Sequence, residues 1–187
     1  MADTREATVA ARVTALFTNT LAADGQSVSS TVRAALNMEP IFRFSDGTTE
    51  NHADKIIKIP GRTVASGGSE NIDMYDLAAF DVGSGPGRDN LGQTVTLAEV
   101  CAFVIYNRSS SAGSITIGGE GSGAAWNSPF GGSDTATNGP IPPDGLWMIV
   151  TRDDPAFAVA DATNHLLKIA ASGGSVSYDA VIIGRSA

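Results

Sequence analysis

The sequence predicts an all-β protein, an antiparallel β-sandwich of jelly-roll type with an extended N-terminal strand or arm. Apolar and polar residues alternate with a period of two in many short segments, which is the pattern of half-buried strands. Glycine makes up 21 of the 187 residues, and Gly, Pro, Asp and Asn separate these segments into about ten to twelve short strands. Short strands of this kind, divided by turn signals, are typical of sandwiches and jelly rolls.

The first element is a long strand over residues 8–21. Val9, Ala11, Val13, Ala15 and Phe17 fall on one face, and the threonines fall on the other. A helix is the alternative because alanine is frequent here, but the threonine content and the lack of a capping residue favour a strand. Residues 1–22 therefore form a candidate arm or exchanged strand. The alternative is that this strand completes its own sheet.

The remaining strands follow from the same alternation, with turns between them. Asp24-Gly25 and Asp46-Gly47 mark two of the turns, and Pro60-Gly61 interrupts a further pair of strands. The expected strands cover residues 27–36, 41–44, 55–59, 62–65, 102–107, 114–118, 146–151, 156–160, 165–171 and 175–184. Residues 71–80 begin as a strand at Ile72, and a short turn of helix is an alternative for their end. Together they form a single domain over residues 1–187.

A polar, Gly-rich stretch from Gly118 to Asn138 holds Trp126 and Phe130. Some β-sandwich modules present aromatic rings in such a loop as a platform on which a sugar stacks, so the two rings are candidate loop contacts. The alternative is that the two rings close one end of the sandwich or a seam between subunits.

Charge excludes several classes of partner. The formal net charge is −8, with 12 basic and 20 acidic residues. Nucleic-acid binding needs clustered Lys and Arg, and an anionic membrane surface attracts the same residues, so we expect neither partner. The longest apolar run, residues 100–106, is too short to span a bilayer, and the N-terminus lacks the pattern of a secretory signal. Cys101 is the only cysteine and lies in an apolar run, which predicts a small buried side chain.

The sequence predicts no catalytic residue, no metal site and no cofactor. His52 has Asp54 two residues away, but no serine stands in a nucleophile context, and His165 has no evident partner. The carboxylates Asp46, Glu50, Asp54, Asp153 and Asp154 do not have the spacing of a calcium loop. The glycines of residues 83–92 lack the helix that a phosphate-binding loop needs.

The C-terminal half contains a series of hairpin-like segments in a fixed order. They read IDMYDL at 72–77, VTLAEVCAFVIYN at 95–107, SITIGG at 114–119, IPPDG at 141–145 and HLLKIAASGGSVSYDAVIIG at 165–184. This series resembles a family of small structural proteins of tailed bacteriophages. Residues 7–21 and 51–54 match that family more loosely, and the long loop at 118–138 departs from it.

The resemblance implies a non-enzymatic virion component, most simply a capsid decoration or cement protein. Such proteins commonly form homotrimers that bind the major capsid protein, so the implied location is the capsid surface after synthesis in the bacterial host cytoplasm. The candidate contacts with a neighbouring subunit or the capsid are Val9, Val13 and Phe17, and the candidate loop contacts are Trp126 and Phe130. The alternative function is a receptor- or carbohydrate-binding β-sandwich of a phage tail or fibre.

Overall fold

The computed structural model describes residues 5–11, 13–16, 21–23, 26–28, 35–38, 40–78, 80–110 and 112–186. The described residues form fifteen β-strands and one short 3-10 helix, η1 (Ser128–Phe130). The prediction of an all-β, antiparallel sandwich is confirmed, while the jelly-roll subtype stays a prediction. Contacts divide the chain into two compact units, one of residues 1–7 and 43–187 and one of residues 8–42, where the sequence predicts a single domain with an arm at 1–22.

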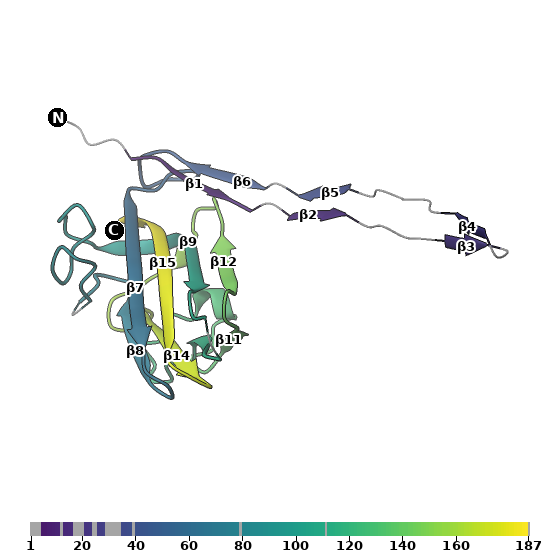
Figure 1. Ribbon diagram of the computed structural model, residues 1–187. Helices are drawn as coiled ribbons and strands as arrows, with labels where there is room; N and C mark the ends of the chain where they lie inside the picture. Colours follow the sequence, from purple (N-terminus) through teal and green to yellow (C-terminus); the bar gives the residue numbers. More distant parts are fainter. Residues whose placement is uncertain are drawn as a thin grey trace. The chain divides into compact units, whose positions relative to one another are not determined.

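The larger unit, called the body here, is built from two antiparallel sheets (Figure 1). In the first sheet the strand order is β11 (Thr137–Ile141), β10 (Ser114–Gly118), β14 (Leu166–Ser172) and β8 (Ser69–Asp73). In the second it is β12 (Leu146–Val150), β9 (Leu97–Asn107), β15 (Val176–Ser186) and β7 (Lys55–Val64), with β13 (Phe157–Ala158) also paired to β9. The two longest strands, β9 and β15, lie side by side at the centre of the second sheet.

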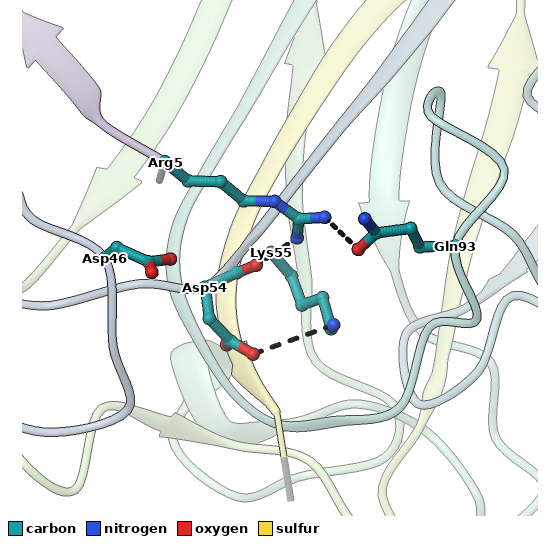
Figure 2. A pocket seen from close by; sticks show the side chains of 5 residues that line it. All are labelled: Arg5, Asp46, Asp54, Lys55 and Gln93. Atoms are coloured by element: carbon teal, nitrogen blue, oxygen red, sulfur yellow. Dashed lines mark hydrogen bonds and ion pairs between the residues drawn. The ribbon is translucent and has the colours of Figure 1, made fainter. Parts of the chain in front are cut away.

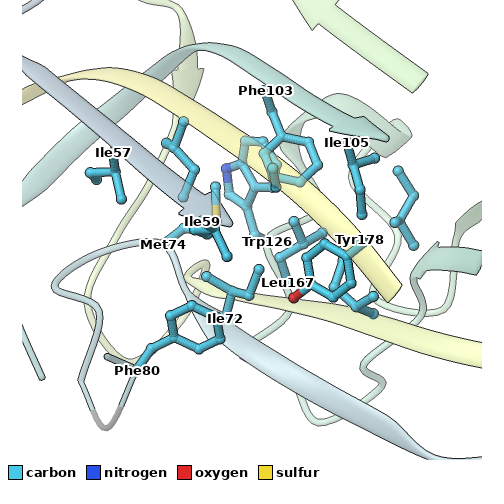
Figure 3. Close-up of a cluster of buried hydrophobic side chains, with 14 of the residues drawn as sticks. Ile57, Ile59, Ile72, Met74, Phe80, Phe103, Ile105, Trp126, Leu167 and Tyr178 are labelled. Atoms are coloured by element: carbon cyan, nitrogen blue, oxygen red, sulfur yellow. The ribbon is translucent and has the colours of Figure 1, made fainter. Parts of the chain in front are cut away.

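Side chains that alternate along the strands of both sheets form the hydrophobic core between them (Figure 3). β14 contributes Leu167 and Ile169, and β9 contributes Phe103 and Ile105, all with 0% exposed. The connection from β8 to β9 adds further buried side chains, which are Met74, Leu77, Phe80, Val82 and Val95. The alternation read from the sequence therefore sets the inward faces, and an irregular connection supplies part of the core.

β7 corrects the prediction of two strands broken at Pro60-Gly61. It runs without interruption from Lys55 to Val64, because Pro60 lies on an edge strand, where its missing N–H removes no bond to a second neighbour. The register of the neighbouring strand β15 shifts between Tyr178 and Ala180, so that Pro60 and Gly61 together face Asp179. This is a β-bulge, and Gly61 adopts the positive φ of +61° that it needs.

β11 is a strand that the sequence pattern does not predict. It follows the Gly-rich stretch, and Gly139 and Pro140 lie within it. Four of its five residues are exposed, so no apolar alternation marks it. Sequence periodicity finds strands that bury one face, and β11 buries only Ile141.

The smaller unit, residues 8–42, is called the ribbon here, together with the strand ends that join it to the body. β3 (Leu21–Ala23) pairs with β4 (Gln26–Val28), β2 (Val13–Leu16) with β5 (Ala35–Met38), and β1 (Ala7–Ala10) with β6 (Ile41–Phe44). The earlier the strand lies in the sequence, the later its partner lies, so the three pairs are nested. The expected turn at Asp24-Gly25 lies outside the described residues, and the strand expected at 27–36 corresponds to β4 and β5 with undescribed residues between them.

Candidate functional site

A polar pocket of about 220 Å³ lies within the body and is lined by Arg5, Asp46, Asp54, Lys55 and Gln93 (Figure 2). The guanidinium of Arg5 donates to the backbone oxygen of Asp54 and to the side-chain oxygen of Gln93. Nζ of Lys55 lies 3.7 Å from Oδ2 of Asp54. Two cationic and two carboxylate side chains line the pocket, so their formal charges cancel.

The pocket joins three distant parts of the chain. Arg5 also approaches the buried carboxylate of Asp89, with 3.3 Å between Nη2 and Oδ2. Asp54 accepts two hydrogen bonds from Ser186 near the C-terminus, at 2.7 Å from its backbone N–H and at 2.6 Å from its hydroxyl. These contacts of the pocket residues connect the N-terminal segment and the end of β15 to the start of β7. The residues that line the pocket therefore have a structural role.

His52 and Asp54 do not form a pair. Nδ1 of His52 donates to the backbone oxygen of Glu50 at 2.7 Å, which makes it part of a turn. The carboxylate of Asp54 is engaged by Ser186 instead. This arrangement fits the interpretation of His52 as a loop histidine.

His165 has a partner that the sequence did not reveal. Its Nε2 lies 3.7 Å from Oδ2 of Asp73, at the end of β8. Oδ1 of Asp73 accepts from the backbone N–H of Tyr75 at 2.9 Å. Burial raises the pKa of Asp73 above its ordinary value, and the nearby His165 opposes this shift. The carboxylate thus closes the turn after β8, and the imidazole lies beside it.

Arg185 and Asp89 are the two charged residues that are buried in the described part of the chain, each with 1% exposed. Nη1 of Arg185 lies 2.6 Å from Oε2 of Glu99 and donates to the backbone oxygen of Asp153 at 2.8 Å. Nε and Nη2 donate to the backbone oxygens of His52 and Arg152, both at 3.1 Å. A buried charge needs such complete pairing. Sequence reasoning missed this cluster, and the signal was a lone arginine in the apolar run of β15.

A second polar network crosses from one sheet to the other. The hydroxyl of Tyr178 (β15) donates to Oε1 of Glu70 (β8) at 2.9 Å, and Arg62 (β7) forms an ion pair with the same carboxylate. Burial and the Glu70 charge raise the pKa of Tyr178 far above its ordinary value. Arg62 also lies over the ring of Phe80, 4.5 Å from its centroid. This network ties the two sheets together.

Cys101 is fully buried, as the sequence predicts. Its Sγ lies 3.8 Å from the backbone oxygen of His52. Burial raises the pKa of the thiol from 9.0 to about 11. A thiol in this state is a poor nucleophile.

Trp126 lies in the core with 1% exposed, which corrects the expectation of an exposed loop contact. Its Nε1 donates to the backbone oxygen of Ala158 at 3.0 Å. Its ring packs edge-on against Phe103, Phe130 and Phe157. The burial of Trp126 agrees with the alternative interpretation, in which these rings close one end of the sandwich. No face of the indole is free to stack on a sugar.

Phe130 also packs against the core instead of forming a free platform. It is partly buried and stacks on Trp147, with 6.0 Å between ring centroids and 15° between ring planes. The Gly-rich loop therefore turns both of its aromatic rings inward, which the residue types alone did not reveal.

The three candidate subunit contacts lie in or beside the ribbon. Val9 is in β1 with 7% exposed, so its side chain is not displayed on this chain's surface. Val13 begins β2, and Phe17 lies outside the described residues. That these residues contact a neighbouring subunit stays a prediction.

Within the described ranges, no group of three or more His, Cys, Asp or Glu side chains could hold a metal ion. In the same part of the chain, no helix has the length and apolar character to cross a membrane. Comparisons with known proteins gave no match, whether to family models, to curated proteins or to solved structures.

Proposed function

We propose that the chain is a non-enzymatic structural protein of a bacteriophage virion, a capsid decoration or cement protein that binds the outer shell as a homo-oligomer and stabilises it. The observation that carries the proposal is the division into a packed body and a second unit, residues 8–42, whose described strands pair two by two. Isolated two-stranded hairpins are marginally stable in water. Contact with another surface would stabilise these strand pairs.

The composition of the ribbon supports an assembly role. Roughly half of residues 8–42 are Ala, Val, Leu, Ile, Met or Phe. Two strands cannot enclose these side chains between them, because a sheet needs a second layer to bury its apolar face. A neighbouring subunit or the capsid would provide that layer.

The body supplies a rigid base for such a contact. Arg185 and Glu99 fix the end of its central strand, and Tyr178 and Glu70 tie the two sheets together. A protein that binds only the assembled shell stabilises it by mass action, by about 2.7 kcal/mol per site at a free concentration of one hundred times Kd. Binding alone would therefore stabilise the shell, and a cement protein needs no catalytic reaction.

Co-sedimentation tests the proposal directly. Purified protein is mixed with empty mature shells of the phage that encodes it, and the pelleted fraction is measured together with the temperature at which the shells dissociate. We expect saturable binding and a higher dissociation temperature, with no binding to shells of an unrelated phage. Absence of the protein from the pellet at saturating concentration would contradict a decoration role.

A further inference from the structure

The sheet edge formed by β12, which the two-residue β13 continues along β9, differs from the other three sheet edges in the described body. β12 reads LWMIV and contains no charged residue, proline or glycine. The other three edges each carry a protecting feature: lysines and a proline in β7, acidic residues in β8, and Gly139-Pro140 in β11. Charges and prolines on an edge prevent another chain from pairing with it.

Both faces of β12 are apolar. Trp147 and Ile149 pack against the core, so Leu146, Met148 and Val150 lie on the opposite face of the sheet. Leu146 is 60% exposed, and no residue of β12 is buried.

The apolar face continues across the sheet beyond β12. Met148 is paired with Val104 of β9, which is paired in turn with Val181 of β15. All three residues are partly exposed. An apolar row ending at an unpaired backbone edge is a surface that a further strand would extend and cover.

The ribbon carries no net formal charge. Residues 8–42 hold two arginines and two acidic residues, Arg12, Arg33, Asp24 and Glu39, so the whole formal charge of −8 lies on the rest of the chain. Two bodies of −8 repel each other, whereas a contact made by the ribbon adds no net charge of its own at the neighbouring body.

Strand geometry matches as well. Among the described residues β2 pairs with β5 alone, and the sheet to which β12 belongs ends at that strand. β2 has four residues and β12 has five, which is enough for a short antiparallel or parallel pairing. Adding β12 to the pair of β2 and β5 would give the ribbon the third strand that independent stability requires.

We infer that β12 is the acceptor edge for the ribbon of a second copy of this chain, which adds its Val13–Leu16 strand to the five-stranded sheet. Ribbon and edge are different surfaces, so each copy donates one and accepts one, either reciprocally between two copies or head-to-tail in a ring whose rotation closes. The inference rests on the homo-oligomer of the proposed function and names the surfaces that build it.

Two full-length double variants test the two surfaces of the contact one at a time. L146K/M148K places charges on the acceptor edge, and V13K/A15K places them on the donated strand. Leu91→Lys is the matched control, because Leu91 is an apolar residue with 70% exposed in the loop between β8 and β9. Light scattering after size exclusion gives the mass of each protein, and thermal unfolding confirms that each body is folded.

We expect the parent chain and the Leu91→Lys control to be oligomers and both double variants to be monomers of 19.1 kDa. An equal mixture of the two double variants should form a species of two chains, because one partner keeps an intact ribbon and the other keeps an intact edge. Each variant alone should remain a monomer at the same total concentration.

Three results would overturn the inference. A monomeric parent chain excludes assembly between copies in solution, an oligomeric V13K/A15K variant places the contact elsewhere, and a monomeric mixture shows that ribbon and edge are not partners. Binding to phage shells is measured separately, by the co-sedimentation experiment described above. A chain that assembles as described but fails to bind shells leaves this inference standing and removes the proposed function.

Discussion

The guanidinium of Arg185 and the carboxylate of Glu99 meet at 2.6 Å between the two longest strands of the body, and Arg185 has only 1% of its surface exposed. Glu99 Oε2 also accepts from the backbone N–H of Ala156 at 3.0 Å. The pair therefore holds the C-terminal strand, the start of β9 and the segment before β13 in one place.

Replacing Glu99 with alanine should destabilise the body strongly. The variant leaves the buried charge of Arg185 without its counter-ion, which typically costs about 3–5 kcal/mol of unfolding free energy. Urea unfolding followed by tryptophan fluorescence measures the change. Glu50→Ala is the control, because Glu50 is exposed, and its effect should stay within about 0.5 kcal/mol. Equal effects of the two variants would refute a structural role for the pair.

Trp126→Ala should act on stability. The side chain is 1% exposed and packs against three phenylalanine rings, so its loss opens a cavity that costs about 3–5 kcal/mol. Thermal unfolding and near-UV circular dichroism check this. Leu91→Ala, at a residue with 70% exposed, should leave the melting temperature almost unchanged. A Trp126→Ala protein as stable as the parent would contradict the buried position.

Cys101 should be almost inert towards thiol reagents in the folded protein. Burial raises the pKa of the thiol from 9.0 to about 11, and a rise of two pH units lowers the thiolate fraction at pH 8 by about one hundredfold. The labelling rate is compared between the native protein and the protein in denaturing urea. Labelling of the native protein within tenfold of the unfolded rate would show that the thiol is accessible.

The same shift gives a pH dependence with a definite sign. Well below pH 9 the thiol is protonated in both states and contributes almost no pH dependence. As the pH rises from 9.0 to about 11, the unfolded chain loses this proton while the folded chain keeps it, so the free energy of unfolding falls by at most about 1.4 kcal/mol per pH unit. The difference between parent and Cys101→Ala unfolding curves over this range isolates the effect. A difference that does not change with pH would disprove the shift.

Gly184→Ala should disturb the packing of β15 on β9. A Cβ atom at this position would lie 2.6 Å from the backbone oxygen of Glu99 and 2.9 Å from Leu97. Backbone cannot give way as a flexible side chain can, so we expect a loss of about 1–3 kcal/mol. The melting temperature is compared with that of Ser172→Ala, at the exposed end of β14. Equal melting temperatures would show that β15 has room at Gly184.

The sequence by itself determined the all-β class and most of the inward faces. Period-two alternation predicted strands over residues 114–118 and 165–171, because a strand that buries one face must alternate, and the structure buries Ile115, Ile117, Leu167 and Ile169 there. The buried state of Cys101 followed from its apolar neighbours. β11 escaped this reasoning because it buries almost nothing, and the continuity of β7 through Pro60 depends on its position at a sheet edge.

Only the tertiary structure decided which residues meet. Arg185 and Glu99 are 86 residues apart, and Tyr178 and Glu70 are 108 apart, so no local pattern links them. The inward turn of Trp126 depends on Phe103 and Phe157, which come from other strands. The unprotected edge at β12 becomes visible only once the order of strands is known, because the apolar run LWMIV reads the same whether a strand is central or at an edge. Periodicity reports the two faces of a strand, and long-range pairing determines its neighbours.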